Sequence, residues 1–430
     1  MALTLLVAGL VVLIVLGAPI GIAMVVVPAT YILFTGEIPL SAVPYQMYEA
    51  IAIQPLLAVP FFILTAELMN SGKMTERLLN LARELVGRLR GGLAQMNIVG
   101  SMMFAAMNGS AIADVAAIGS VMIPAMKKEG YPGPFAAAIT AMGSTMGGIL
   151  PPSILLVILA STMGISIGGV FAAGLLPGVL VGMVLMGMVY ALAWKRGWGR
   201  YEVPFTFRAL LRSIIGAWAA LLIPVIIVGG IVTGTFTATE AGAVAAVVAL
   251  LLGIIVYRTL TARVLAGALF RSVKITSSVF LIIAASGPLS WLLNRIGALK
   301  GLEQFLLQFA ASPLLFGLVL VLFILVVGTL LEPVPCVVML GPTLVSVCVA
   351  AGYHEIQAAI FMSIGFIMGS VSPPVGICYF TAAAIGGEKV DAVARAIVPF
   401  LAADIIVMFV VLLVPSVTLA LPRLLGIINA

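Results

Sequence analysis

The stretch Gly147-Gly148-Ile149-Leu150-Pro151-Pro152-Ser153 interrupts a long apolar region with two glycines and two prolines. These residues cannot all continue one helix, because a proline has no amide hydrogen to donate to the carbonyl group four residues earlier. The carbonyl groups that lose their donors become available to a cation. Pro152 and Ser153 are suited to begin a second half-helix, whose amide end favours an anion. The alternative is a kinked helix with a purely structural role.

The chain repeats this pattern 222 residues later, in Gly369-Ser370-Val371-Ser372-Pro373-Pro374-Val375-Gly376. The same gap-free offset aligns further identical residues: Gly130 with Gly352, Tyr131 with Tyr353, Gly143 with Gly365, Met146 with Met368 and Pro177 with Pro399. A Gly-Tyr pair and a Pro-Pro pair at one offset indicate an internal repeat, although a chain rich in alanine, valine and leucine yields some matches by coincidence. Paired apolar segments broken by glycine and proline are typical of the binding site of a secondary transporter.

The composition indicates the class of protein. Of the 430 residues, 63% are hydrophobic and only 8% are charged, whereas soluble domains are roughly 45–50% apolar and about 25% charged. This excludes a cytosolic enzyme, a disordered chain and a nucleic-acid-binding protein, and the lack of alternating polar and apolar residues excludes an outer-membrane barrel. We therefore expect an all-α polytopic membrane protein. Its net charge of +6 is typical of basic cytoplasmic loops.

Residue patterns typical of enzymes and structural metal sites are missing from the sequence. The three cysteines lie in apolar stretches without ligand-like spacing, and there is a single histidine, which argues against disulfides and a zinc site. The sequence also has no nucleophile–base pair, phosphate-binding loop or dinucleotide fingerprint. We therefore expect a protein that is not an enzyme.

Clusters of charged residues divide the chain into apolar segments. We expect roughly ten to twelve crossings, at one membrane-spanning helix per ~20 apolar residues. The clearest predicted spans are Val170–Trp194, Ile214–Thr233, Ala241–Tyr257, Val279–Leu293 and Pro313–Leu331. The segment Thr75–Leu89 has leucines at helical spacing with arginine and glutamate between them, which predicts an amphipathic helix at the membrane interface.

The segment Asn108-Gly109-Ser110-Ala111-Ile112-Ala113-Asp114 predicts a tight reversal of the chain within the membrane. Gly109 lies between two small polar residues, and Ser110 and Asp114 share one face if a helix begins there. Hydroxyl and amide oxygens, together with freed carbonyl groups, suit Na⁺, and an aspartate in the membrane is functional by default. A structural N-cap at Ser110 is the alternative, and the two roles are compatible.

The segment Glu332-Pro333-Val334-Pro335 stands at the position of the second half that corresponds to Ser110. A proline directly after an acidic residue breaks a helix, so the segment predicts a second hairpin tip at which Glu332 supports an ion site. A salt-bridged or interfacial Glu332 is the alternative.

Taken together, these motifs resemble the large membrane subunit of TRAP transporters, the DctM-type permease. The resemblance extends from about Gly17 to Leu421-Pro422 and covers essentially the whole chain. It is carried by Pro60-Phe61-Phe62-Ile63-Leu64, Glu67-Leu68-Met69, Gly87-x-x-x-Gly91-Gly92-Leu93, Asn108-Gly109-Ser110 with Asp114, Ile123-Pro124-Ala125-Met126, Gly130-Tyr131 and the two Pro-Pro elements. The chain departs from the family where Glu332 replaces a frequent aspartate and Ser372 a common threonine.

The resemblance implies an elevator-type secondary transporter of the bacterial inner membrane, with two inverted repeats that each contain a re-entrant hairpin. It implies Na⁺-coupled import of a small organic acid, such as a C4-dicarboxylate, another carboxylate or a sugar acid. The implied partners are a small membrane subunit, a periplasmic substrate-binding protein and membrane lipid, without nucleic acid. The implied regions are scaffold helices with an interfacial helix in 1–90, a first transport-domain repeat in 91–200, scaffold helices in 201–300 and a second repeat in 301–430.

Carried over by position, the resemblance assigns Na⁺ and the substrate to the hairpin tips and the broken segments. The expected Na⁺ ligands are Asn108, Ser110, Asp114, Gly147, Pro151, Glu332, Gly369 and Ser372. The expected substrate-binding residues are Asn108, Gly109, Ser153, Ser372, Pro373 and Gly376. No cofactor is expected, and no metal other than Na⁺ as the coupling ion.

The alternative function is a single-subunit elevator-type transporter of Na⁺ and a dicarboxylate or citrate, which would need no binding protein. An intramembrane enzyme would need clustered acids or a His/Asp/Ser set, and the intramembrane acids here are scattered. A channel would show neither alternating access nor accumulation of substrate.

Overall fold

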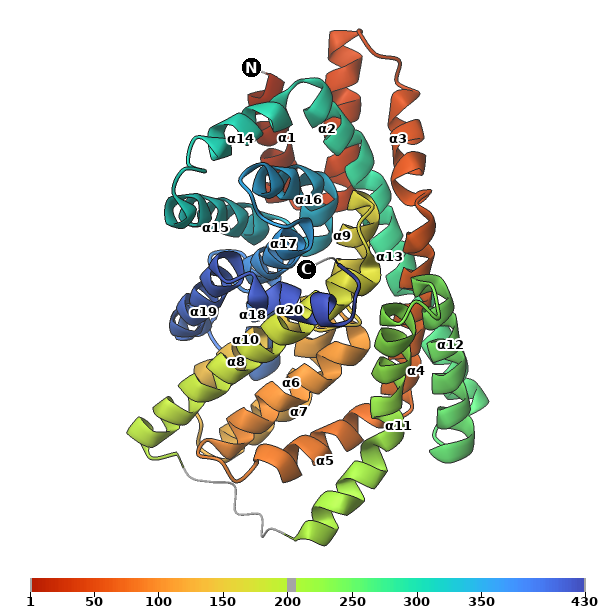
Figure 1. The fold of residues 1–430 in the computed structure, drawn as a ribbon, viewed down its shortest axis with the longest axis vertical. Helices are drawn as coiled ribbons and strands as arrows, with labels where there is room; N and C mark the ends of the chain where they lie inside the picture. Colours follow the sequence, from red (N-terminus) through yellow and green to blue (C-terminus); the bar gives the residue numbers. More distant parts are fainter. Residues whose placement is uncertain (1, 199–205, 429–430) are drawn as a thin grey trace.

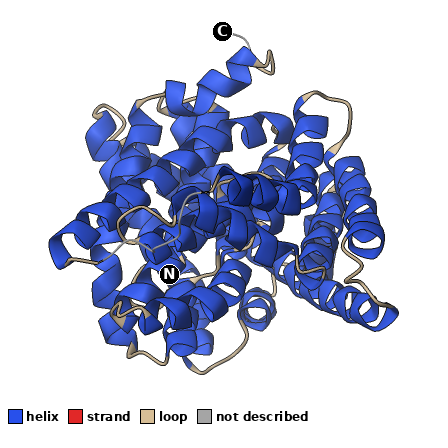
Figure 2. Ribbon diagram, turned by 90° about the horizontal axis from the view of Figure 1, so that it is seen from below, coloured by secondary structure: helices blue, strands red, loops and turns tan. Residues whose placement is uncertain are grey.

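The computed structural model describes residues 2–198 and 206–428, and for residues 2 and 106–108 it describes the backbone alone. These parts of the chain consist of helices joined by loops, without a strand (Figure 2). The predicted all-α architecture is therefore confirmed for the described chain.

Seven of the described helices are long and apolar enough to cross a membrane, and the number rises to eight if Ala42–Ile51 and Gln54–Ser71, bent by 66°, form one span. This is fewer than the roughly ten to twelve crossings expected from apolar length alone. The reason is that both predicted breaks divide apolar regions into helices too short to span on their own, such as Ile154–Met163 and Ile377–Gly386.

One group of helices lies along the right side, the top and the lower end of Figure 1, and the long helix α13 packs against several of its members. Helix α13 packs against α2, α3 and α4, and α4 packs against α12. The span expected at Val279–Leu293 is only part of α13, which also contains Arg271 and Lys274. The helices of this group are α1 (Ala2–Val15), α2 (Ile20–Thr35), α3 (Ala42–Ile51), η1 (Gln54–Leu57), α4 (Ala58–Ser71), α5 (Met74–Val86), α11 (Phe207–Val232), α12 (Ala238–Leu251), the π-helical turn η3 (Leu252–Val256), α13 (Ala262–Arg295) and α14 (Ala298–Leu307).

The remaining helices form two successive units of the same design. In each unit two helices form a hairpin, two half-helices follow with a break between them, and a long helix ends the unit. The first unit contains α6 (Gly92–Asn108), α7 (Ala111–Lys128), α8 (Gly133–Ser144), η2 (Thr145–Gly148), α9 (Ile154–Met163) and α10 (Ile167–Arg196). The second contains α15 (Pro313–Leu330), α16 (Pro333–Ala350), α17 (Glu355–Gly369), α18 (Ile377–Gly386) and α19 (Val390–Leu413), followed by α20 (Ser416–Leu424).

The two units interlock. The half-helix α18 of the second unit packs against α7 and α8 of the first, and the half-helix α9 of the first packs against α16 and α17 of the second. The hairpin and the break that the sequence predicts in each half are therefore present, and the ends of the four half-helices meet in the centre of the molecule.

The predicted amphipathic segment forms helix α5, which crosses the lower end of the molecule in Figure 1. It buries Leu78, Leu79 and Leu81 against the rest of the protein, while Leu85 remains exposed. Its polar face carries most of its charged side chains, as the spacing predicts.

Candidate functional site

A cavity of about 610 Å³ lies where both predicted hairpin tips meet α4 and α13. The first tip contributes residues 109–113, and the second tip contributes residues 332–334. The broken segments contribute Ile154, Leu155, Ile367, Ser370, Ile377 and Cys378. The rest of the wall comes from α4 and α13: Ile63, Glu67, Arg271, Lys274, Ile275, Ser278, Val279 and Ile282. Elements that are far apart in sequence therefore enclose one space with both polar and apolar walls.

The first hairpin tip touches the first broken segment through its backbone. Gly109 ends α6 in the left-handed conformation, with φ of 60°. A Cβ atom at Gly109 would lie 2.7 Å from the backbone nitrogen of Ile154, the first residue of α9. A Cβ atom at Gly147 would lie 3.4 Å from the backbone nitrogen of Ala111. Only a residue without a side chain permits this approach at Gly109, and the two elements predicted to share an ion site are in contact.

Ser110 stands at the N-cap position of α7, but its side chain makes no capping hydrogen bond. Ser110 lines the cavity, and its hydroxyl is not committed to the helix end. Asn108 is the last residue of α6, and its side chain lies outside the described part of the structure.

Asp114 lies in the first turn of α7 and is only 1% exposed. Among the described residues, neither carboxylate oxygen has a hydrogen-bond partner. Its polar neighbours are Ser101 of α6, whose hydroxyl also has no partner there, and Cys378 of α18. A buried carboxylate is costly unless a cation or a proton accompanies it. The oxygens of Asp114 and Ser101 therefore suit either a small hard cation or a proton.

The first break frees two carbonyl groups. Pro151 and Pro152 follow Gly147 and Gly148 by four residues and cannot donate to them. The Gly148 carbonyl accepts a hydrogen bond of 2.7 Å from the Ser363 hydroxyl of α17. No described residue donates to the Gly147 carbonyl, which leaves an oxygen beside the tip of the first hairpin.

The second break satisfies its own carbonyl groups. The amide of Ser372 donates to the Gly369 carbonyl at 3.1 Å, and the amide of Cys378 donates to the Ser370 carbonyl at 3.0 Å. The Ser372 hydroxyl donates to the Met368 carbonyl at 2.7 Å. Gly369 packs directly on α15, because a Cβ atom there would lie 2.5 Å from the Cα atom of Gly328. The two breaks are therefore alike in position and different in the oxygens they leave unpaired.

Glu332 stands at the N-cap position of α16 without a capping hydrogen bond and lines the cavity. No salt bridge joins it to a described residue. Glu332 and the first tip therefore line the same cavity, and the salt-bridged alternative does not hold for the described chain.

Eight of the described predicted ligands are not in the cavity wall: Asp114, Gly147, Pro151, Ser153, Gly369, Ser372, Pro373 and Gly376. Gly147 and Gly369 instead pack behind the hairpin tips. Ser153 is fully buried and caps α9 by accepting a hydrogen bond of 3.4 Å from the amide of Leu156. Gly376, not a serine, stands at the N-cap of α18, so α18 begins one residue later in the repeat than α9. The assignment of these eight residues to ligands stays a prediction.

The sequence-based prediction missed the cationic wall of α13. The Arg271 guanidinium pairs with Glu67 of α4 at 2.9 Å and donates to the Ser71 hydroxyl at 2.7 Å. The Lys274 ammonium has no hydrogen bond or ion pair with a described residue. Arg271, Lys274 and Ser278 share one helix face. That spacing is the signal that could have found them, but in the sequence they resemble the charged boundary of a span.

The comparisons with known proteins agree with this architecture. Residues 7–417 match the family described as "Tripartite ATP-independent periplasmic transporter, DctM component". The sialic acid TRAP transporter large permease protein SiaM of Vibrio cholerae is 35% identical over 408 residues, which cover 95% of each chain. The C4-dicarboxylate TRAP transporter large permease protein DctM of Pseudomonas aeruginosa is 34% identical over 402 residues, 92% of each chain. The 2,3-diketo-L-gulonate TRAP transporter large permease protein YiaN of Escherichia coli is 33% identical over 391 residues, 90% of each chain.

Two solved membrane transporters share the fold at low sequence identity. The YdaH transporter of Alcanivorax borkumensis has a TM-score of 0.57 at 13% identity and aligns over 84% of this chain and 85% of its own. The MtrF efflux pump of Neisseria gonorrhoeae has a TM-score of 0.57 at 15% identity and aligns over 87% of this chain and 83% of its own. The chain is thus a polytopic membrane protein and not an enzyme, and it belongs to the DctM family of large permease subunits of tripartite ATP-independent periplasmic (TRAP) transporters.

Proposed function

We propose that this permease subunit imports a small organic anion together with Na⁺. The observation that carries the proposal is the charge arrangement of the central cavity. Lys274 of α13 supplies a cation without a described partner, and Glu332 of the second tip supplies an anion without one. The Arg271–Glu67 pair adds no net charge. The cavity therefore has separate places for an anionic substrate and a cation.

The substrate class follows from the Lys274 ammonium. An ammonium group in a partly apolar cavity favours a carboxylate or a similar anionic group, because hydrogen bonds to a charged partner are roughly twice as strong as neutral ones. The names of the relatives include sialic acid, C4-dicarboxylates and 2,3-diketo-L-gulonate. All of these are organic acids, and the cavity volume of about 610 Å³ suits molecules of this size.

The Na⁺ site belongs beside Asp114. Its unpaired carboxylate, the unpaired Ser101 hydroxyl and the Gly147 carbonyl offer hard oxygen ligands around the first tip. Na⁺ bound there removes the cost of the buried charge and holds the tip against the first break. A second ion at Glu332 would act in the same way on the second tip.

The proposed movement is an elevator. Residues 91–200 and 301–430 form the mobile transport domain, and residues 1–90 and 201–300 form the scaffold. The hairpin tips lie on the first body, and α4 and α13 lie on the second. A substrate between them is released to the other side of the membrane when the transport domain slides along α13. A periplasmic binding protein would deliver the substrate, and a small membrane subunit would complete the scaffold.

The test is uptake of radiolabelled succinate, sialic acid and 2,3-diketo-L-gulonate into proteoliposomes that contain the chain with its small subunit and its binding protein. Accumulation of one of these acids under an inward Na⁺ gradient, and not under an equal K⁺ gradient, supports the proposal. Uptake that is equal in both gradients contradicts Na⁺ coupling. Na⁺-driven uptake by the chain alone, without either partner, supports the single-subunit alternative.

A further inference from the structure

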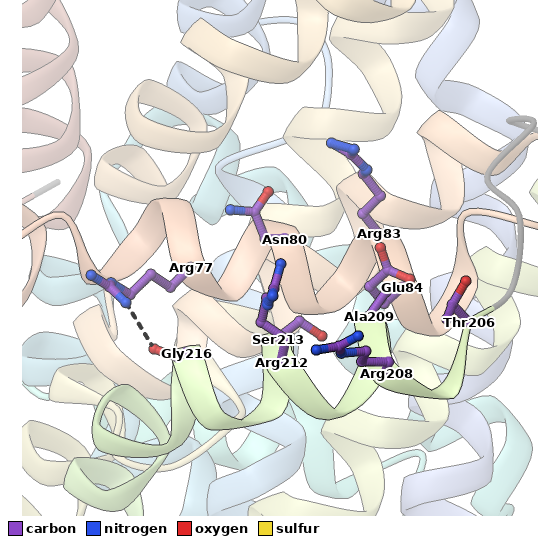
Figure 3. Close-up of a pocket in the computed structure, with 10 residues that line it drawn as sticks. All are labelled: Arg77, Asn80, Arg83, Glu84, Thr206, Arg208, Ala209, Arg212, Ser213 and Gly216. Carbon is purple, nitrogen blue, oxygen red and sulfur yellow. Dashed lines mark hydrogen bonds between the residues drawn. The ribbon is translucent and has the colours of Figure 1, made fainter.

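A second cavity, of about 600 Å³, lies between helix α5 and the first turns of helix α11 (Figure 3). It shares no lining residue with the central cavity. Its lining consists of Arg77, Asn80, Arg83 and Glu84 of α5, and of Thr206, Arg208, Ala209, Arg212, Ser213 and Gly216 at the start of α11. Four of these ten residues are arginines and one is acidic, so the cavity carries a net positive charge.

The arginines on α11 have no partner among the described residues. Arg208 and Arg212 are exposed, and neither makes a hydrogen bond or an ion pair with a described residue. On α5, Arg77 is fixed: its Nη1 donates to the Gly216 carbonyl at 3.5 Å, and its guanidinium lies 4.2 Å from the centre of the Tyr257 ring. The acidic residue Glu84 lies 3.7 Å from Arg88. Arg208 and Arg212 therefore supply the cavity with guanidinium groups that have no described counter-ion. A guanidinium group matches phosphate in geometry and charge.

An apolar surface continues directly from the cavity along α11. Leu211, Ile214, Ile215 and Trp218 are between 42% and 61% exposed, and α11 is one of the helices able to cross a membrane. A soluble phosphate would use only the arginines. A molecule that carries a phosphate next to hydrocarbon chains would use both surfaces.

The cavity lies at the basic end of the molecule. The end of α10, the whole of α5 and the start of α11 all lie in the lower part of Figure 1. Besides the arginines of the cavity, this part carries Lys195 and Arg196 at the end of α10 and Arg88 just after α5. Basic residues are retained on the cytoplasmic side of membrane proteins, where anionic lipids attract them. This end therefore meets the headgroups of the cytoplasmic leaflet.

We propose that this cavity binds the phosphodiester headgroup of an anionic phospholipid, with the acyl chains along the exposed face of α11. The headgroup contacts both α5 and the membrane-spanning helix α11. Helix α5 in turn connects α4 to the first hairpin. The site is independent of the transported substrate and of the coupling ion.

The experiment compares lipid retention by native mass spectrometry of the purified protein titrated with phosphatidylglycerol or with phosphatidylcholine. The test variant is Arg208→Gln with Arg212→Gln. The matched control is Lys195→Gln with Arg263→Gln, which removes two exposed basic side chains without described partners outside the cavity. Since neither variant loses a hydrogen bond or an ion pair with a described residue, both should melt at the wild-type temperature, and the melting curve is recorded for each.

The expected result is that phosphatidylglycerol binds more tightly than phosphatidylcholine. The test variant should weaken phosphatidylglycerol binding about 10- to 30-fold, the factor expected for two basic residues beside an anionic headgroup, and the control should not change it. Equal retention by the wild type and the test variant would overturn the proposal. Thermal stabilisation of the wild type by inorganic phosphate, lost in the test variant and unaccompanied by selective phosphatidylglycerol retention, would assign the cavity to a soluble anion and would also overturn it.

Discussion

The Ser363 hydroxyl of α17 donates a hydrogen bond of 2.7 Å to the Gly148 carbonyl oxygen in η2. Both residues are buried, and they belong to different repeats. The break in the first half exposes this carbonyl group, and the second half supplies the donor that satisfies it. The two broken segments are thus held to each other by a polar contact as well as by apolar packing.

Replacement Ser363→Ala should lower the free energy of unfolding by about 1–3 kcal/mol, because it leaves a buried carbonyl group without a donor. Thermal unfolding of the purified protein measures the change. The matched control is Ser286→Ala, because the equally buried Ser286 hydroxyl donates only to the Ile283 carbonyl of its own helix. If the Ser363→Ala protein melted at the same temperature as the control, the contact between the repeats would contribute nothing to the free energy of unfolding.

Replacement Gly109→Ala should destabilise the first hairpin tip. The new Cβ atom would meet the backbone of Ile154 at 2.7 Å, and the left-handed φ of 60° disfavours a side chain. The combined cost should be about 2–4 kcal/mol, and it should appear as a lower melting temperature and as loss of uptake.

The control for this prediction is Gly164→Ala. Gly164 has a similar φ of 69°, but a Cβ atom there meets nothing within 4 Å. It therefore reports the backbone strain alone, which is about 1–2 kcal/mol. If the two variants were equally stable, the close contact between the tip and α9 would be absent in the protein.

Replacement Lys274→Gln should raise the KM for anion uptake about 10- to 100-fold, because a hydrogen bond to a charged group in the cavity contributes about 1.5–3 kcal/mol. Melting in Na⁺ should not change, since Lys274 has no described partner. Uptake in proteoliposomes is the measurement. Lys300→Gln on α14, an exposed lysine outside the cavity, is the control, and equal KM values for the two variants would remove Lys274 from the substrate site.

The breaks and hairpins were predictable because their causes are local. A proline has no amide hydrogen in any fold, so Pro151 and Pro373 predict the helix interruptions from the sequence alone. The repeat offset then relates Ser110 to Glu332, and the structure brings both to one cavity.

The partners of these elements could not be predicted, because they depend on how the helices cross. Nothing in the sequence near Gly148 indicates that Ser363 donates to its carbonyl, or that Ser101 and Cys378 lie beside Asp114. In the sequence, Lys274 cannot be told from a lysine at the membrane interface. In the structure it lies within the long helix α13 and lines the cavity. Ser153 follows its Pro-Pro pair and caps α9, whereas Ser372 precedes its pair and the N-cap of α18 is Gly376.

The central claim is that Na⁺ binds at the first hairpin tip beside Asp114. Its most direct test is thermal unfolding of the purified protein in NaCl and in KCl at equal ionic strength, with wild type and Asp114→Asn compared. At a Na⁺ concentration of about 100 times the dissociation constant, the wild type should gain about 2.7 kcal/mol in NaCl over KCl. The Asp114→Asn protein, which keeps the shape of the side chain without its charge, should lose the part of this gain that the ion at the first tip supplies, and a gain equal to that of the wild type would also contradict the claim. Wild-type protein that melts at the same temperature in both salts would contradict the claim.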